Sequence, residues 1–490
     1  MEFRENQQFE PGAGWLLLGI CGSGMRSLCD HLVSSGQRVI GSDGDEEALQ
    51  LLSRQRLPGV TLVDWGSLQR QVSPPVSTVV HSVAVDSSHP LLVRFRGQGL
   101  KVQSLPESLA EQFGGVAQYC VAGTHGKSTT TGMLWWILSR AGRRPARYVG
   151  AEFQGPLPFV GSGLSEEFDS AVLEACEYRD SFLTFAPQLC VLTGLEPDHF
   201  DWFADLRAME AGFARFLSRV RSGGRLVYSG DCASSRRLAA SHPELRSVSW
   251  SAEGNSADWQ LDAFPSERRV VFPCRPGGVI SSGRLVAANG SVEVPLQLCI
   301  PGLHNLRNAA AAILAAMELG VDGLEAARSL VDFCGMRRRF EHRGTWRGVD
   351  LIDDYAHHPT AVTCALRTVR EVYPGRRVVV LFEPHQMSRT GRLLEDFASA
   401  LVAADLVFVL PVLPARESAE PGARTTLARR LVEQIRLAGG NAKLVGDLDH
   451  SARTLEDAAR VGDVIITLGA GRTHLIHDEI HRTIHRDSAA

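Results

Sequence analysis

The sequence predicts an α/β protein of three domains, each built on a mainly parallel β-sheet covered by helices. The length of 490 residues accommodates three domains of about 150 residues each. Short apolar runs typical of strands alternate with helical patterns in the first and last thirds of the chain, and this alternation indicates parallel sheets. Polar clusters directly follow several of these strands. We place the domains at residues 1–114, 115–330 and 331–490.

The composition excludes several classes of protein. With 44% hydrophobic and 22% charged residues and a net charge of -4, the chain resembles an ordinary soluble protein and gives no reason to expect nucleic-acid binding. The ten cysteines include no CxxC pair, so neither a zinc knuckle nor a disulfide framework is expected. Residues 1–14 lack the pattern of a signal peptide, and no apolar run reaches the roughly 20 residues that span a bilayer. We expect a cytoplasmic protein without membrane insertion.

A glycine-rich turn organises the first domain. A strand at 15–18 runs into Gly19-Ile20-Cys21-Gly22-Ser23-Gly24-Met25, a helix extends to about residue 36, and a second strand leads to Ser42 and Asp43. This Rossmann-like βαβ unit can cradle a diphosphate. Because the glycines are spaced G-x-x-G-x-G, the pattern favours a diphosphate nucleotide over a nicotinamide cofactor. A glycine turn that only packs against the sheet is the structural alternative.

A second glycine loop opens the central domain. A strand from Val116 ends at Gly123-Thr124-His125-Gly126-Lys127-Ser128-Thr129, and a helix then continues past Leu138. Strand, loop and helix in this order direct backbone N–H groups towards one small volume, which suits the phosphates of a nucleotide. Lys127 can reach the outer phosphates and Ser128 can bind Mg²⁺. Val121 occupies the place of the usual first glycine, which leaves an ordinary turn as the alternative.

Acidic residues follow the next two predicted strands of the central domain. The strand at 170–173 ends at Glu174, where a carboxylate beside a phosphate loop can hold Mg²⁺. The strand at 189–193 is followed by Glu196, Asp198 and His199, which predict a second metal or phosphate contact rather than a solvated loop. Short alternating runs from 226 to 298 predict β-hairpins. Residues 301–305 are expected to cap a helix through 308–314.

The third domain repeats the alternation, with strands predicted at 349–352, 377–382, 406–410 and 463–468. Polar clusters at 353–358 and 383–389 follow two of these strands. In open α/β sheets, ligands bind beyond the carboxyl ends of the strands. We therefore predict a binding site at these clusters, although any one of their histidines alone would more often be structural.

Taken together, these segments resemble the Mur ligase family from Gly19 to about Gly471. The resemblance rests on the two glycine loops and on a series of further blocks in the same order. These blocks are Gly41-Ser42-Asp43, Glu174-Ala175-Cys176-Glu177-Tyr178, Asp198-His199, His304-Asn305 with Asn308, Arg338-Arg339-Phe340, residues 353–359, and Pro384-His385 with Ser388-Arg389-Thr390.

The resemblance implies three sets of site residues. It implies a UDP-substrate site at Gly19, Gly22, Ser23, Gly24, Met25, Ser42 and Asp43. It implies an ATP site at Gly123, Thr124, His125, Gly126, Lys127, Ser128, Thr129, His304, Asn305, Asn308, Arg339 and Asp354. It also implies Mg²⁺ ligands at Ser128, Glu174 and His199, a catalytic set of Lys127, Glu174, His199 and Arg339, and an amino-acid site at His357, His385 and Arg389.

The branch of the family that this chain resembles joins L-alanine to the lactyl carboxylate of UDP-N-acetylmuramate, with ATP and Mg²⁺. The reaction passes through an acyl phosphate and belongs to peptidoglycan synthesis, and so to cell wall biogenesis, cell shape, cell division and the cell cycle. The resemblance leaves monomer and homodimer open. Three positions depart from the family pattern: Ser128 replaces threonine, Gly194 replaces asparagine, and Gln386 stands where some members carry arginine.

Other functions stay open at this point. The nearest alternative is a ligase that adds a whole peptide or another amino acid to UDP-N-acetylmuramate during cell-wall recycling, and Gln386 leaves that choice to the third domain. The block at Leu413-Pro414-Ala415-Arg416-Glu417 is more similar to the alanine branch. A nicotinamide-dependent oxidoreductase would leave the Lys127 loop unexplained. A phosphate-loop ATPase without ligation would turn over ATP in the absence of an amino acid.

Lysine is rare in this chain. It occurs only at positions 101, 127 and 443, whereas several sister ligases hold a second Mg²⁺ through a carbamoylated lysine in the central domain. Lys127 cannot serve in this way, because carbamoylation would reverse the charge that attracts the ATP phosphates. Arginine is always protonated and offers no substitute. We expect His199 to take over this role.

Overall fold

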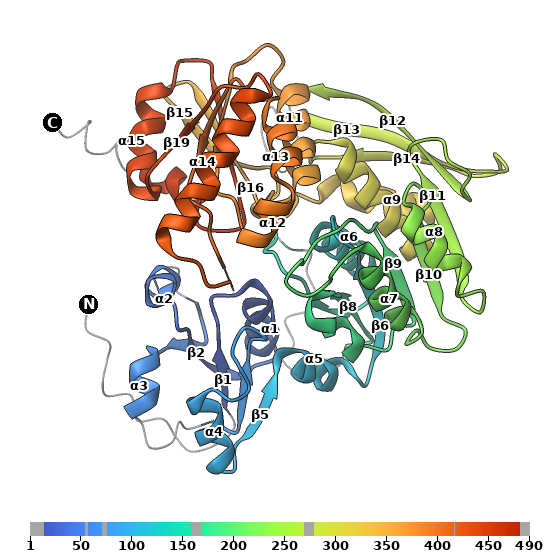
Figure 1. Cartoon of the computed structure of the whole chain (residues 1–490). Coiled ribbons are helices and arrows are strands. Elements are labelled where there is room, and N and C mark those ends of the chain that lie inside the picture. Colours follow the sequence, from blue (N-terminus) through green and yellow to red (C-terminus); the bar gives the residue numbers. More distant parts are fainter. Residues whose placement is uncertain are drawn as a thin grey trace.

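The computed structural model describes residues 14–53, 57–70, 76–155, 157, 168–268, 279–415 and 417–480. Most of the N-terminal segment considered above for a signal peptide, and Arg416 of the alanine-branch block, lie outside these residues. Three β-sheets follow one another along the chain, as the sequence predicts, and together with their helices they make a three-part α/β protein. Figure 1 shows the N-terminal part below and the C-terminal part above it.

The first sheet has five parallel strands in the order β3-β2-β1-β4-β5. Its central strand is apolar on both faces, since Leu16, Leu17 and Leu18 are all fully buried. The strands are β1 (Gly14–Leu18), β2 (Arg38–Ser42), β3 (Val60–Leu62), β4 (Thr78–His81) and β5 (Lys101–Ser104). The helices are α1 (Ser23–Ser34), α2 (Glu46–Ser53), α3 (Trp65–Arg70), α4 (Pro90–Gly97) and α5 (Leu105–Phe113).

The second sheet has nine strands in the order β14-β13-β12-β11-β10-β9-β6-β8-β7. The strands are β6 (Ala117–Ala122), β7 (Pro145–Tyr148), β8 (Ser170–Glu174), β9 (Leu189–Leu192), β10 (Arg225–Ser229), β11 (Arg246–Ser251), β12 (Trp259–Arg268), β13 (Val279–Ala287) and β14 (Glu293–Leu298). The helices are α6 (Lys127–Arg140), α7 (Leu206–Leu217), α8 (Ala233–Ala240), α9 (Leu303–Glu318) and α10 (Gly323–Ser329), with 3₁₀ segments η1 (Tyr178–Thr184) and η2 (Leu330–Asp332).

The prediction of hairpins throughout 226–298 is wrong in its first part. Strands β12, β13 and β14 do pair antiparallel, but β10 and β11 are parallel and are joined through α8. Leu226 and Val227 are consecutive and both fully buried. A strand covered on both faces does not alternate between apolar and polar residues, so alternation could not identify it.

The third sheet has the order β15-β16-β20-β17-β18-β19, and only its edge strand β15 is antiparallel to its neighbour. The strands are β15 (Glu341–Trp346), β16 (Val349–Asp354), β17 (Val378–Phe382), β18 (Leu406–Val409), β19 (Ala442–Leu444) and β20 (Val464–Leu468). The helices are α11 (Pro359–Val372), α12 (Met387–Arg392), α13 (Leu394–Leu401), α14 (Pro421–Leu437) and α15 (Leu448–Ala458).

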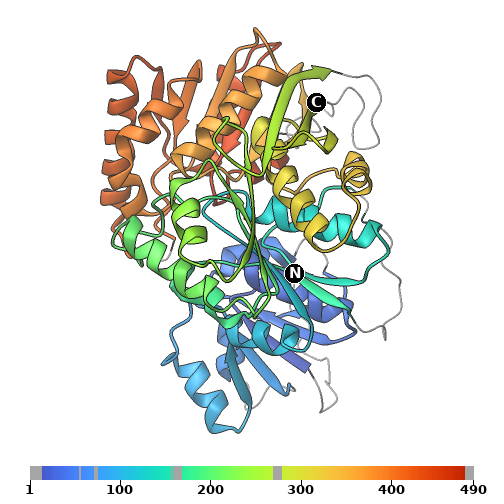
Figure 2. The same cartoon turned by 90° about the vertical axis from the view of Figure 1, so that its right-hand side faces the viewer.

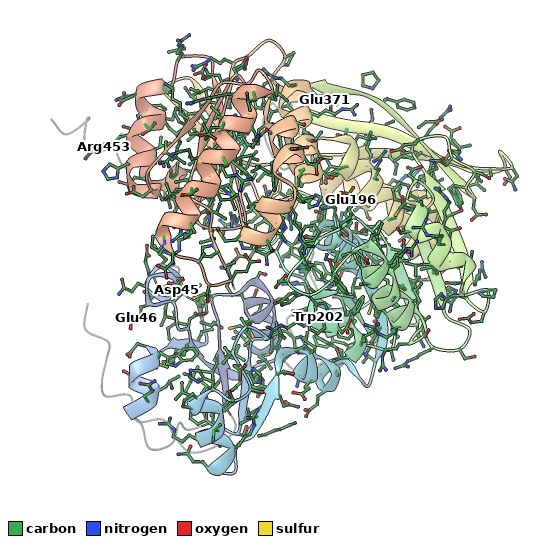
Figure 3. The ribbon with its side chains drawn as sticks, in the orientation of Figure 1. Asp45, Glu46, Glu196, Trp202, Glu371 and Arg453 are labelled. Carbon is green, nitrogen blue, oxygen red and sulfur yellow. The ribbon has the colours of Figure 1, made fainter. Side chains whose placement is uncertain are left out.

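Polar contacts join the three parts. The backbone N–H of Val149, just after β7, donates to Ser27 Oγ of α1 over 3.0 Å. Arg472 Nη2 of the C-terminal part lies 2.6 Å from Asp45 Oδ2 beside the first sheet, where Figure 3 labels Asp45. Figure 2 shows the C-terminal part beside the antiparallel strands of the second sheet. Within the described part of the chain, every helix is too short or too polar to cross a bilayer.

Candidate active site

The loop between β6 and α6 is held by the segment that follows β9. The Thr124 N–H donates to the Gly194 carbonyl over 2.8 Å, and Thr193 Oγ1 donates to the His125 carbonyl over 2.5 Å. Gly194 has φ +139°, a backbone conformation that L side chains rarely adopt. The glycine that replaces the usual asparagine therefore matches the local backbone and leaves the contact to the loop intact.

Lys127 begins α6 and is held by a buried carboxylate. Its Nζ lies 3.0 Å from Glu177 Oε2 and also donates to the Gly123 carbonyl. Glu177 is fully buried and also lies 3.5 Å from His199 Nε2. Burial lowers the pKa of Lys127, but the charge of Glu177 outweighs it and the pKa is raised. Burial likewise raises the pKa of Glu177, which Lys127 and His199 bring below its usual value, so both groups are charged at neutral pH.

The structure brings together the side chains predicted to bind Mg²⁺. Ser128 Oγ donates to Glu174 Oε1 over 3.0 Å. His199 stands close to Glu177, and its buried Nδ1 has no hydrogen-bond partner among the described residues. A hydroxyl, two carboxylates and an uncommitted imidazole nitrogen are a ligand set that fits a divalent cation. Glu177 was not assigned this position from the sequence, although it belongs to the same block as Glu174.

Asn308, one of the residues implied for the ATP site, lies directly behind the phosphate loop, and its Nδ2 donates to Asn305 Oδ1 over 3.4 Å. Asn308 Oδ1 accepts from Thr130 Oγ1 over 3.3 Å, and a Cβ added at Gly126 would meet this same oxygen at 2.3 Å. Gly126 has φ +78°, so only glycine fits here without strain. Asn305 Nδ2 donates to the Pro301 carbonyl over 2.7 Å. Burial lowers the pKa of the neighbouring His304 to about 4.

Arg339 extends from the third part of the chain towards the phosphate loop. Its Nη2 lies 3.5 Å from Ser128 Oγ, and its guanidinium lies over the Tyr355 ring at 4.9 Å. Asp354 accepts from the backbone N–H groups of Phe340 and Ala356, each over 2.8 Å. Oδ2 of Asp354 therefore fixes the segment that carries Arg339, and Oδ1 fixes the turn after β16. Burial raises the pKa of Asp354 to about 6.

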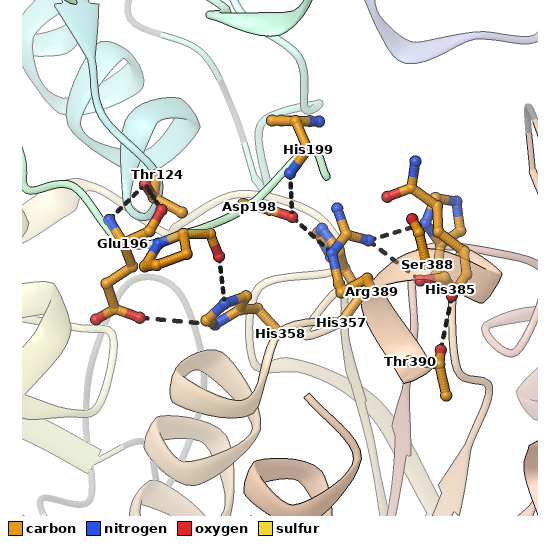
Figure 4. Close-up of polar contacts among 12 residues, drawn as sticks. Thr124, Glu196, Asp198, His199, His357, His358, His385, Ser388, Arg389 and Thr390 are labelled. Carbon is orange, nitrogen blue, oxygen red and sulfur yellow. Dashed lines mark hydrogen bonds and ion pairs between the residues drawn. The ribbon is translucent and has the colours of Figure 1, made fainter. Parts of the chain in front are cut away.

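The predicted amino-acid site contains a buried ion pair between two parts of the molecule (Figure 4). Arg389 Nε lies 2.7 Å from Asp198 Oδ1, and the two side chains are only 2% and 7% exposed. Arg389 Nη1 also donates to the His385 carbonyl over 3.2 Å. The rings of His357 and His385 lie 5.7 Å apart. Because Asp198 precedes His199, this pair connects the amino-acid set directly to the Lys127 set.

Gln386 is buried beside this ion pair. Only 1% of the residue is exposed, and neither its Oε1 nor its Nε2 has a hydrogen-bond partner within the described structure. An unsatisfied buried amide is costly, by about 1–3 kcal/mol. The amide at the position where some members of the family carry arginine therefore has polar atoms left for a ligand.

The first glycine loop is closed mainly by its own backbone. The N–H of Gly19 donates to the Ser42 carbonyl over 2.8 Å, and the N–H of Cys21 donates to Asp43 Oδ2 over 2.9 Å. Asp43 Oδ1 accepts from the Asp45 N–H, so Asp43 ties the loop to β2. Ser42 Oγ is buried and finds no hydrogen-bond partner in the part of the chain that the structure describes. Helix α1 begins after Gly22 with no side-chain cap, which leaves its first N–H groups for an anion.

The other predicted residues of this loop differ in their surroundings. Ser23 begins α1, while Met25 is 1% exposed and lies in the hydrophobic core beneath the loop. A Cβ added at Gly24 would lie 2.7 Å from Tyr148 Oη of the central part. Gly24 therefore permits the close approach of α1 to β7, a role that its spacing in the sequence did not indicate.

A third cluster escaped the sequence analysis. Glu196 Oε2 lies 3.3 Å from His125 Nε2 and 3.7 Å from His358 Nδ1. The three residues come from the phosphate loop, the segment after β9 and the start of α11. Because these residues are far apart in the sequence, no local pattern could have revealed the cluster.

Comparisons with known proteins agree with this architecture. Three family models match in order: the Mur ligase family catalytic domain over 17–115, the Mur ligase middle domain over 121–316, and the Mur ligase glutamate ligase domain over 338–471. The UDP-N-acetylmuramate--L-alanine ligase of Kineococcus radiotolerans is 37% identical, covering 95% of this chain and 94% of that protein. The protein of that name from Paenarthrobacter aurescens is 38% identical, covering 93% of each.

Solved structures show the same fold. The UDP-N-acetylmuramate-alanine ligase of Thermotoga maritima superposes with a TM-score of 0.77 at 21% identity, covering 97% of this chain and 100% of that one. The murein peptide ligase of Psychrobacter arcticus superposes with a TM-score of 0.69 at 26% identity, covering 96% and 98%. Family models along the chain, relatives above 30% identity and a shared three-part fold lead to one conclusion: this chain belongs to the Mur ligase family and is an ATP-dependent ligase.

Proposed function

We propose that the enzyme joins L-alanine to the lactyl carboxylate of UDP-N-acetylmuramate, a step of peptidoglycan synthesis in the cytoplasm, with ATP and Mg²⁺. The observation that carries the proposal is the continuity of the site. Lys127, Glu177 and His199 make one charged group, and Asp198 links it to Arg389 of the third part. A phosphate-activating group and an amino-acid group thus meet at one place, as ligation requires.

The first chemical step activates the carboxylate. A lactyl oxygen attacks the γ-phosphorus of ATP, the bond to the β–γ bridging oxygen breaks, and an acyl phosphate and ADP result. Lys127 exchanges its contacts to Glu177 and the loop carbonyl for phosphate oxygens, and the free N–H groups at the start of α6 stabilise the developing charge. Ser128, Glu174, Glu177 and His199 would hold Mg²⁺, which when bound neutralises phosphate charge.

The second step forms the amide. The alanine nitrogen attacks the acyl carbon, the bond from that carbon to the phosphate oxygen breaks, and the nitrogen loses a proton. The His357 ring can accept this proton, because its Nδ1 lies 2.8 Å from the Tyr355 carbonyl and so carries the hydrogen. Burial and the charge of Arg389 hold the pKa of His357 well below its usual value, so the ring is neutral when the amine arrives, and the bound substrates must raise this pKa for the ring to take the proton. Closure of the three parts over the bound substrates would exclude the water that hydrolyses an acyl phosphate.

We assign the three functions to residues 1–114 for the UDP-substrate, 115–330 for ATP, and 331–490 for the amino acid and closure over the nucleotide. The uncapped start of α1 supports a diphosphate site in the first region. The Arg339 contact to Ser128 supports participation of the last region in the ATP site.

A peptide-adding ligase is the second candidate, because the murein peptide ligase of Psychrobacter arcticus covers nearly the whole chain at 26% identity. The two L-alanine ligases named above are more similar to this chain in sequence, at 37% and 38% identity. The unpartnered amide of Gln386 can hydrogen-bond the carboxylate of a free amino acid beside Arg389.

The test is ADP release by the full-length enzyme with UDP-N-acetylmuramate, ATP and Mg²⁺, measured in parallel with L-alanine, glycine, L-serine and the whole peptide of the recycling reaction. The proposal expects the highest kcat/KM with L-alanine and almost no ADP release without an amine. Preference for the peptide would establish the recycling reaction instead. ADP release that is as fast without any amine as with L-alanine would indicate an ATPase that does not ligate.

A further inference from the structure

The cluster of His125, Glu196 and His358, named above, has the geometry of a transition-metal site. Glu196 Oε2 lies between the two rings, at 3.3 Å from His125 Nε2 and 3.7 Å from His358 Nδ1. All three candidate ligand atoms lie within 4.8 Å of one another. Ligands bound tetrahedrally at about 2.0–2.1 Å from Zn²⁺ are about 3.3 Å apart. Glu196 Oε2 is thus already at ligand spacing from His125 Nε2. The other separations, of up to 4.8 Å, must shorten by ring movements when a metal binds.

The tautomer of His358 leaves its Nδ1 unprotonated at the edge of the cluster. Its Nε2 lies 3.3 Å from the Pro197 carbonyl and can only donate there. Nδ1 must then be the unprotonated nitrogen, and its lone pair accepts from the Thr360 N–H over a long 3.4 Å. Glu196 Oε2 lies 3.7 Å from this nitrogen (Figure 4). A cation bound beside Glu196 would take the place of the long hydrogen bond from Thr360 as the partner of Nδ1.

The surroundings favour the ligand forms that a metal needs. Thr360 Oγ1 donates to Glu196 Oε2 over 2.5 Å and orients the carboxylate, as second-shell groups do around metals. Burial lowers the pKa of His358 to about 4. Burial raises the pKa of Glu196, but the hydrogen bonds and charge of its neighbours bring it to about 2.

The cluster is accessible from solvent and joins two parts of the molecule. The side chains of His125 and Glu196 are 32% and 41% exposed, whereas that of His358 is 7% exposed. His125 belongs to the phosphate loop and His358 caps the start of α11. Figure 3 labels Glu196 at the boundary between the central and C-terminal parts. A metal here would fix the phosphate loop to the C-terminal part.

We propose that His125, Glu196 and His358 form a Zn²⁺ site, distinct from the Mg²⁺ site of the reaction, and that Zn²⁺ bound there inhibits the enzyme by holding the phosphate loop against α11. Two imidazoles and one carboxylate with an open fourth position are ligands typical of zinc. Mg²⁺ prefers oxygen ligands and should not compete.

The test uses Co²⁺ and Zn²⁺ with the chelator-treated full-length enzyme in excess Mg²⁺. We expect the strong visible absorption of four-coordinate Co²⁺, displaced by one equivalent of Zn²⁺. His358→Asn keeps a residue suited to capping α11 and should weaken binding by more than about tenfold. His450→Asn removes an exposed histidine that pairs with Asp447 elsewhere and should leave binding unchanged. Circular dichroism checks the fold of each variant, and Glu196→Gln serves as a second ligand variant.

Three outcomes would overturn the proposal. The first is a wild-type enzyme without the four-coordinate absorption, and the second is an absorption that persists in both His358→Asn and Glu196→Gln. The third is loss of the absorption in His199→Ala, since this would place the metal at the Mg²⁺ ligands. Inhibition of ADP release by Zn²⁺ should weaken in parallel with Co²⁺ binding across the ligand variants.

Discussion

The two glycine loops begin alike and differ in what surrounds them. Each follows a buried strand, and α1 and α6 both start after a glycine without a side-chain cap. Around the first loop the hydrogen bonds are made mainly by backbone groups and Asp43. The second loop begins α6 with Lys127, which contacts the buried Glu177.

This difference distinguishes a loop that only binds a diphosphate from a loop at which phosphoryl transfer takes place. Backbone N–H groups and a helix N-terminus bind an anion without moving charge. A lysine, carboxylates and a histidine can stabilise the charge that develops during phosphoryl transfer. The fold thus uses one backbone arrangement twice and assigns chemistry only to the loop with charged neighbours.

The largest effect is expected from Lys127→Ala, which removes the charge of the second loop. Ligation should fall about a thousandfold or more, while the affinity for UDP-N-acetylmuramate, measured by calorimetric titration, should be nearly unchanged. Lys101→Ala is the matched control, because Lys101 pairs at the surface with Glu111 of α5. Loss of UDP-substrate binding in Lys127→Ala would break the separation between the two loops.

The next largest effect concerns the ion pair that joins the second loop region to the third part. Asp198→Asn leaves the Arg389 guanidinium buried without its counter-charge, which should cost about 3–5 kcal/mol of unfolding free energy. Burial raises the pKa of Asp198, but Arg389 and His199 bring it well below its usual value. The pair therefore stabilises the fold above the unfolded pKa of about 3.8 and is lost as pH falls through the lower folded value.

Calorimetric unfolding in the absence of nucleotide measures this effect. The double variant Asp198→Asn with Arg389→Met should recover part of the lost stability, because no buried charge remains unpaired. A single variant as stable as wild type would show that the pair contributes little to the joining of the two parts.

The sequence predicted elements and loops better than the contacts between them. The strand that ends at Glu174 and the helix that begins at Lys127 follow from local patterns. The partnership of Asp198 with Arg389 spans 191 residues, and no periodicity encodes such a distance. Glu177 was missed because position in a motif does not reveal burial against Lys127. The parallel pairing of β10 with β11 was missed because the consecutive buried residues Leu226 and Val227 of β10 do not alternate with polar ones.

A smaller effect is expected at the first loop, where packing rather than charge is decisive. In Gly24→Ala the added Cβ would lie 2.7 Å from Tyr148 Oη, an overpacking that costs about 1–3 kcal/mol. Adding Tyr148→Phe removes that oxygen and leaves the end of the Leu105 side chain at 3.1 Å and the nearest ring atom of residue 148 at 3.9 Å, so most of the lost stability should return. Thermal unfolding of both variants decides this, and failure of the second change to rescue would point to a backbone requirement.

The smallest effect is expected from bicarbonate, which should not change turnover at all. The three lysines of the chain lie in different places: Lys101 pairs with Glu111 on the first part, Lys443 is exposed on the edge strand β19, and Lys127 is held by Glu177. Lys101 and Lys443 lie outside the second loop. Lys127 cannot become a carbamoylated metal ligand there without losing the charge that binds phosphate.

His199 offers the alternative ligand, because its buried Nδ1 has no partner within the described residues and its Nε2 lies 3.5 Å from Glu177 Oε1. Turnover in carbon-dioxide-free buffer should therefore equal turnover with added bicarbonate, whereas His199→Ala should lose turnover and keep its circular dichroism. The matched control is His450→Asn, an exposed histidine far along the chain. A large increase in wild-type turnover on adding bicarbonate would mean that a carbamoylated lysine completes the metal site. Lys127, Glu177 and His199 would then not be sufficient for the chemistry of the second loop.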